Sequence, residues 1–146
     1  MNRFTLIETG MTHHGAALAA VRRAVFIEEQ GVPEALEWDE FDAVSTHWLA
    51  MLGDGTPVGC ARLLPDGHIG RMAVLPTWRG QGIGRALLDA ALAGARARGL
   101  TCVRLSAQTH AADFYRRAGF VTQGGPYEEA GIPHLAMLKR LDAEPI

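Results

Sequence analysis

Residues 71–85, with the sequence RMAVLPTWRGQGIGR, predict a strand, a glycine-rich loop and the first turn of a helix. The strand ends at Pro76, which has no N–H to give to a neighbouring strand. Glycines at alternate positions (Gly80, Gly82 and Gly84) let backbone amides approach a ligand closely. The following helix would direct its free N–H groups and the positive end of its dipole at the loop, an arrangement that suits a phosphate or pyrophosphate group.

Two familiar phosphate motifs do not fit this loop. The dinucleotide fingerprint requires G-x-G-x-x-G, whereas these glycines are evenly spaced by two. The P-loop requires Gly-Lys-Ser/Thr, whereas Gly84 is followed by Arg85 and Ala86. A purely structural turn with surface arginines therefore stands beside the phosphate-binding interpretation.

The composition indicates one cytoplasmic domain over residues 1–146. The chain is 48% hydrophobic and carries a formal net charge of −2, which gives no support for a nucleic-acid or membrane-surface partner. No apolar run approaches the roughly 20 residues of a membrane span, and the N-terminus lacks a signal-peptide core. Cys60 and Cys102 lie far apart without metal-ligand spacing, and we expect reduced thiols and no metal site.

Charge is unevenly distributed along the chain. Residues 28–42 contain seven acidic residues and no Lys or Arg, whereas residues 62–104 contain seven arginines and only two acidic residues. The two segments could serve a cationic substrate and an anionic cofactor. A solvated acidic loop and a few helix-end arginines would produce the same pattern.

Hydrophobic periodicity and turn residues predict alternating strands and helices. The middle strands should form an antiparallel meander, and the strand–helix–strand unit that follows should be a right-handed parallel crossover. Thr12 and Thr109 are the expected caps of the first and third helices. Strands are expected at 3–8, 47–52, 58–64, 68–75, 100–106, from 120 and at 133–141, helices at 13–29, 82–98 and 109–118, an acidic linker at 34–45 and a loop at 124–126.

These pieces together resemble the GNAT superfamily of N-acetyltransferases over nearly the whole chain. Residues 79–84 match the acyl-CoA signature Arg/Gln-x-x-Gly-x-Gly/Ala, and residues 111–120 match the motif Ala-x-x-Phe-Tyr…Gly-Phe. Three further stretches, residues 25–33, 106–108 and 129–134, resemble the ElaA-like and YjcF-like branch of that superfamily.

The resemblance implies an α/β (α+β) GNAT-like, acyl-CoA N-acyltransferase fold. Its mixed central sheet of about six or seven strands, flanked by about four helices, would splay between the strand ends near Val74 and Ser106. Acetyl-CoA would lie in that gap as co-substrate, with its pantetheine paired to the backbone of the first strand. The implied cofactor-binding residues are Met72, Ala73, Val74, Arg79, Gly80, Gln81, Gly82, Ile83, Gly84, Arg85, Gln108, Phe114 and Tyr115.

The resemblance also places Tyr115 beside the sulfur, as general acid for the leaving thiolate. Many family members have Asn where this chain has Gln108, whose amide reaches one methylene further toward the thiol or the pantetheine. The base is open between Glu28 and Glu29, whose carboxylates could bind the ammonium or take its proton through water. His110 and His134 are further candidates, since imidazole titrates nearest to neutral pH, and bulk water is another.

The expected function is transfer of an acetyl group from acetyl-CoA to a primary amine by direct attack in a ternary complex. The acceptor would be a small molecule or a peptide, and two copies of the chain could form a homodimer. The alternative is a non-catalytic module that binds or senses acyl-CoA in the same cleft. Trp38, Phe41 and Trp48 could shape the acceptor pocket, although core packing is the interpretation we favour for them.

Overall fold

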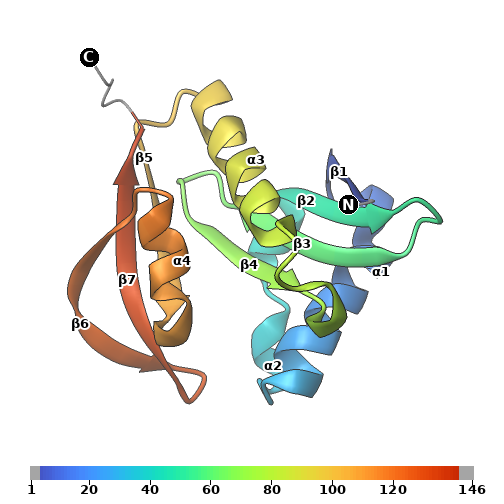
Figure 1. The fold of residues 1–146 in the computed structure, drawn as a ribbon, viewed down its shortest axis with the longest axis horizontal. Helices are drawn as coiled ribbons and strands as arrows, with labels where there is room; N and C mark the ends of the chain where they lie inside the picture. The colour runs from blue at the N-terminus through green and yellow to red at the C-terminus, as the bar shows by residue number, and fades with distance from the viewer. Residues whose placement is uncertain (1–3, 142–146) are drawn as a thin grey trace.

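The computed structural model describes residues 4–141, which form seven strands and several helices (Figure 1). The strands are β1 (Phe4–Thr9), β2 (Thr46–Leu52), β3 (Pro57–Leu63), β4 (Ile69–Val74), β5 (Cys102–Gln108), β6 (Val121–Glu129) and β7 (Ile132–Arg140). The α-helices are α1 (Met11–Arg22), α2 (Glu34–Glu37), α3 (Ile83–Ala97) and α4 (Ala112–Arg117). A π-helix, η1 (Arg23–Glu29), continues α1, and short 3₁₀ turns are η2 (Glu40–Ala43), η3 (Pro76–Trp78) and η4 (Thr109–Ala111).

The first sheet has the strand order β1-β2-β3-β4, and every neighbouring pair is antiparallel. The predicted meander is therefore confirmed. Side chains alternate across this sheet, so both faces are buried. Leu49 and Cys60 pack with α1 on one face, and Ala50 and Ala61 pack with α3 on the other.

The second sheet has the order β5-β7-β6 and is also antiparallel. Helix α3 connects β4 to β5, and the two strands meet at one parallel bridge between His68 and Arg104. There the Arg104 N–H donates to Gly67 O at 3.0 Å. Beyond this bridge β4 and β5 diverge and belong to separate sheets (Figure 1).

Several local predictions are wrong, and most of them concern element ends. Gly10, not Thr12, precedes the first helix, and its last third is the π-helix η1. Thr109 opens a 3₁₀ turn and makes no side-chain cap for α4. The segment 124–126 lies inside β6, where the pairing with β7 shifts register, because a bulge absorbs its glycines. The acidic linker contains α2 and η2. None of the helices within residues 4–141 could cross a bilayer.

Candidate functional site

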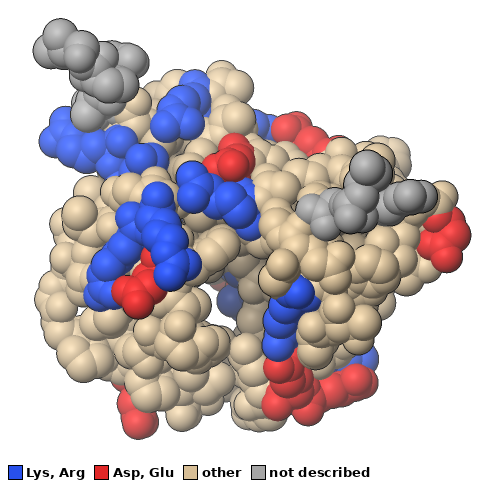
Figure 2. Space-filling view, in the orientation of Figure 1, with Lys and Arg blue, Asp and Glu red and all other residues tan. Residues whose placement is uncertain are grey.

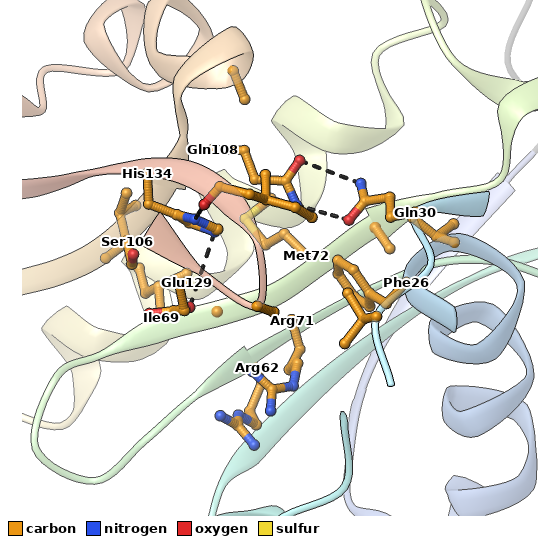
Figure 3. A pocket seen from close by; sticks show the side chains of 18 of the residues that line it. Phe26, Gln30, Arg62, Ile69, Arg71, Met72, Ser106, Gln108, Glu129 and His134 are labelled. Atoms are coloured by element: carbon orange, nitrogen blue, oxygen red, sulfur yellow. Dashed lines mark hydrogen bonds and ion pairs between the residues drawn. The ribbon is translucent and has the colours of Figure 1, made fainter. Parts of the chain in front are cut away.

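A cavity of about 760 Å³ occupies the cleft between the two sheets (Figure 3). The space-filling view shows the same region as a hollow between two halves of the molecule (Figure 2). The edge strands β4 and β5 face each other across it, and η1, α4 and β7 complete its walls. Within the described residues, β4 forms a ladder with β3 alone. Its other edge therefore offers backbone groups to an extended ligand, apart from Val74 O, which accepts a hydrogen bond from Arg79.

Strand β4 bulges where it lines the cavity. Cys60 pairs with Ala73 and Arg62 pairs with Gly70, so two residues of β4 oppose one residue of β3. The first of these two, Arg71, adopts a left-handed φ of 48°, which is unfavourable for a side chain larger than glycine. Its guanidinium is held by Glu37 and Asp39 at 3.2 Å each, which keeps this backbone conformation in place. The bulge re-aims the backbone groups of the cavity wall.

The glycine-rich loop borders a second cavity, of about 260 Å³, at the start of α3. Gly80 and Gly82 have φ values of 76° and 88°, in the region that only glycine adopts freely. A Cβ on Gly84 would lie 3.5 Å from the Phe114 ring, so glycine leaves this part of the cavity open. The first N–H groups of the 15-residue helix α3 face this loop and have no carbonyl partners within the helix.

The wall of the large cavity formed by β4, η1, α2 and η2 is called the first wall. Arg79 connects the glycine loop to this wall. Its Nε donates to Val74 O at 2.8 Å, and its Nη1 and Nη2 donate to the Glu29 carboxylate at 2.8 and 2.6 Å. The hydrogen bond from Arg79 lowers the pKa of Glu29. Arg85 instead pairs with Asp89, one turn along α3, at 3.0 Å.

Tyr115 projects from α4 into the cavity and contacts the opposite wall. Its ring meets Phe114 and Phe120 edge to face, at centroid distances of 5.1 and 5.9 Å. Its hydroxyl lies 3.7 Å from Met72 Sδ on β4. Burial raises the pKa of Tyr115 to about 12, because a phenolate would lose its hydration there, and the group stays a protonated phenol at neutral pH.

Gln108 spans the cleft from β5 to the end of the first helical segment. Its Nε2 donates to Gln30 Oε1 at 2.7 Å, and Gln30 Nε2 donates back to Gln108 Oε1 at 3.3 Å. His110 Nε2 donates to the same Gln108 oxygen at 2.7 Å. The amide at this position is thus held by two partners, of which Gln30 had not been predicted as a site residue.

The acidic segment divides into two sets: Glu37, Asp39 and Asp42 are buried or half-buried, whereas its other four acidic residues are exposed. Arg22 is buried between Glu37 and Asp42, at 2.8 and 2.7 Å, and Arg62 reaches Asp42 at 3.0 Å. Burial alone would raise the pKa of Asp42, but the hydrogen bond and charge of Arg22 outweigh it and lower that pKa. Two arginines of the basic segment, Arg62 and Arg71, therefore neutralise acids that the charge pattern had left available for a substrate.

The three predicted pocket aromatics lie in three different environments, and Trp78, which was not among them, lies in a fourth. Phe41 lines the large cavity, whereas Trp48 is buried in the core against α3. Trp38 stacks on Arg22, with the Arg22 Cζ atom 4.9 Å from the centroid of the Trp38 ring. Trp78 borders the small cavity beside the glycine loop.

The predicted base candidates are also separated. Glu28 and Glu29 are exposed and do not line the large cavity, whereas His110 and His134 do. His134 is buried, and its Nδ1 donates to Ile132 O at 2.7 Å. Its Nε2 lies 3.9 Å from the Glu129 carboxylate, a residue that sequence reasoning had not singled out (Figure 3).

Residues 10–141 match the family model described as an acetyltransferase (GNAT) domain. The chain belongs to the GNAT acetyltransferase family. This GNAT chain is 37% identical to the uncharacterized N-acetyltransferase YjcF of Bacillus subtilis over 123 residues, covering 82% of this chain and 87% of the relative. It is 32% identical to the protein ElaA of Escherichia coli over 140 residues, covering 86% of each chain. The match to the ElaA-like and YjcF-like branch is thereby confirmed.

Solved structures give the same result for the fold. The crystal structure of Escherichia coli ElaA superposes with a TM-score of 0.83 at 30% identity, covering 93% of this chain and 99% of that one. An acyl-CoA N-acyltransferase from Pseudomonas aeruginosa also gives a TM-score of 0.83, at 34% identity and the same coverage. The predicted GNAT-like fold, with seven strands and about four helices, is confirmed.

Proposed function

We propose that this GNAT chain transfers an acetyl group from acetyl-CoA to a primary amine by direct attack in a ternary complex. The observation that carries the proposal is that the two cavities adjoin, since Val74, Arg79, Gly84 and Phe114 line both. Together they form a path from the glycine loop at the start of α3, past the edge of β4, to the half-buried phenol of Tyr115. Membership of the family supports acyl transfer from acyl-CoA, and the path supports the roles of individual residues.

The residues along this path fit acetyl-CoA. Backbone groups of Gly80 to Gly84 and the side chains of Arg79 and Arg85 would hold the diphosphate, since oriented N–H groups at a helix N-terminus favour anions. The edge of β4 at Met72, Ala73 and Val74 would pair with the pantetheine amides as an added strand would. When bound, acetyl-CoA supplies an activated acetyl thioester. The amides of Gln81 and Gln108 and the ring of Phe114 complete the proposed binding set.

Tyr115 would protonate the sulfur as it leaves. A thiol ordinarily has a pKa of about 8.5, below that of a buried phenol, so the transfer is unfavourable in water. Burial raises the pKa of Tyr115 to about 12, which makes the phenol a weaker acid, and it also disfavours a free thiolate. Proton transfer would therefore require the Tyr115 hydroxyl to be hydrogen-bonded to the sulfur as negative charge develops there. Met72 would keep the hydroxyl on the cofactor side of the cavity.

The acceptor we propose is a primary amine of a small molecule or a peptide, handled by a single cytoplasmic domain. Cys60 and Cys102 are free thiols, as expected for a reducing compartment. A homodimer remains part of the proposal, and sedimentation analysis of the purified chain at micromolar concentration would test it.

Two measurements on the purified chain test the function. Calorimetry should detect binding of acetyl-CoA, and a thiol-release assay should detect turnover with at least one amine from a panel of monoamines, polyamines, aminosugars, amino acids and peptides. Tyr115→Phe should lower kcat by about 10²-fold or more and leave acetyl-CoA affinity nearly unchanged. Tight binding without turnover for any amine would favour the sensing module, and equal turnover in both proteins would remove Tyr115 as the acid.

A further inference from the structure

The opposite wall of the cavity, formed by β5, β6 and β7 and called the second wall, carries a histidine–carboxylate pair. On β7, His134 lies directly opposite Gln108 of β5 and Tyr127 of β6, so the three side chains leave the same face of the sheet. Gln108 and His134 both line the large cavity, as does Glu129 near the end of β6 (Figure 3). The pair therefore borders the space that also contains Tyr115.

The hydrogen bond of His134 determines which ring nitrogen is available. A carbonyl oxygen only accepts hydrogen bonds, so Nδ1 must carry the proton that it shares with Ile132 O at 2.7 Å. In the neutral ring, Nε2 is then the nitrogen with a free lone pair. Tyr127 stacks on the ring at a centroid distance of 6.1 Å and an interplanar angle of 27°, which restricts its rotation.

The carboxylates that line the cavity differ in their partners. Glu37 and Asp39 are paired with arginines, whereas Glu129 lies 3.9 Å from Nε2 of His134 and has 57% of its side chain exposed. A carboxylate beside Nε2 stabilises the imidazolium that forms when the ring takes a proton. Its exposure gives that proton a route to solvent.

The other candidate bases are engaged or lie elsewhere. Glu29 is held by Arg79 through two hydrogen bonds, and Glu28 does not line the cavity. His110 uses Nε2 to hold Gln108. His68 also lines the cavity, but its side chain is exposed and its Nδ1 pairs with Asp66 on the turn where the sheets meet.

We propose that His134 is the general base for the acceptor amine and that Glu129 binds the ammonium and stabilises the imidazolium. This proposal rests on the acetyltransferase function proposed above. His134 Nε2 takes one proton from the ammonium, and the neutral amine forms the C–N bond as the C–S bond of the thioester breaks. After the attack the nitrogen loses a second proton, which is passed to the Tyr115 oxygen and replaces the proton that Tyr115 gives to the departing sulfur. The products are an amide, the free thiol and one proton released through Glu129.

The variant His134→Asn tests this role with the fold preserved. The Asn amide can still donate to Ile132 O, in place of Nδ1, but it has no atom at the position of Nε2. His13→Asn, on the exposed start of α1, is the matched control for the same chemical change. Glu129→Gln keeps the shape of its side chain and removes the charge.

The kinetic probes are ethylamine, which is protonated at neutral pH, and hydroxylamine, which is largely neutral there. Thiol release is measured from the full chain with acetyl-CoA, after subtraction of the rate without enzyme. We expect His134→Asn to lower kcat/KM for ethylamine by about 10²-fold or more and to affect hydroxylamine far less, because a neutral amine needs no base to gain its lone pair. Glu129→Gln should show the same selectivity with a smaller loss.

A spectroscopic readout is independent of the acceptor. In ¹⁵N-imidazole NMR of the full chain, the neutral His134 ring should show a protonated Nδ1 and an unprotonated Nε2, with the signals assigned by their loss in His134→Asn. Observation of the opposite tautomer would overturn the proposed role of His134 as general base. An equal fall in kcat/KM for ethylamine and hydroxylamine in His134→Asn would overturn it as well. Transfer by wild type that is unchanged in His134→Asn would overturn the base and leave the acetyltransferase standing. Absence of transfer to any amine by wild type would overturn both.

Discussion

The two walls of the cavity use acidic residues in opposite ways. On the first wall, Glu37, Asp39 and Asp42 lie in a buried or half-buried network with Arg22, Arg62 and Arg71. On the second wall, Glu129 is exposed and faces a histidine. The first arrangement holds an element in place, since breaking a buried charge pair is costly, whereas the second leaves a charge available to a ligand.

This difference teaches that the number of acids near a site does not measure the charge it offers. Arg71 itself has the left-handed backbone conformation at the bulge of β4, and the ion pairs of its side chain hold it there. The acidic segment therefore shapes the wall on which the pantetheine is proposed to pair. The carboxylate proposed to meet the acceptor comes from β6, about 90 residues later.

The largest effect should come from opening the buried network. Arg22→Met would leave Glu37 and Asp42 buried without their main partner, and we expect the free energy of unfolding to fall by about 3–5 kcal/mol. Urea denaturation measures this change. Arg116→Met, at the exposed pair with Asp113, is the control and should change little. Similar losses in both variants would mean that burial does not distinguish the two kinds of pair.

The phenol that faces the first wall should titrate late. In Tyr127→Phe, Tyr115 is the one remaining tyrosine, and its ultraviolet absorption should report an ionisation at about pH 12. Because burial penalises the phenolate, this ionisation lies above the usual tyrosine pKa of about 10. An ionisation at about pH 10 would show that the phenol is hydrated and would contradict the effect of burial.

Acid should weaken the first wall through Asp42. Its native pKa is lowered, mainly by Arg22, so its contribution to stability is complete above the unfolded-state pKa and is lost as the pH falls through the native value. The difference in unfolding free energy between wild type and Asp42→Asn should therefore shrink from about pH 5 to about pH 2. Thermal unfolding at a series of pH values measures it. A constant difference would mean that Asp42 acts through shape and not through charge.

The smallest effect concerns the exposed pair between Glu29 and Arg79. Glu29→Gln should release the Arg79 guanidinium for the diphosphate and tighten acetyl-CoA binding by up to about fivefold, since exposed ion pairs contribute about 1 kcal/mol or less. Calorimetry measures the affinity. Glu34→Gln frees Arg23, away from the glycine loop, and serves as the control. Weaker binding in Glu29→Gln would show that the pair organises the loop instead of competing with the ligand.

The sequence by itself determined the features that depend on residues close together in the chain. The strand, glycine loop and helix of residues 69–97 follow from Pro76 and from glycines that adopt left-handed φ values. The meander follows from alternating apolar residues and turn signals, and Tyr115 was identified by its motif. The failed caps at Thr12 and Thr109 lie at helix ends, where packing moves a boundary by a few residues.

The tertiary structure alone decided which distant residues meet. It brought Glu37 and Asp42 to Arg22, Gln30 to Gln108 across 78 positions, and Glu129 to His134 at the edge of the cavity. It also placed a left-handed arginine at the bulge of β4. The physical reason is that hydrogen bonds and ion pairs depend on the distance between atoms in the fold, whereas sequence patterns register only the order of residues along the chain.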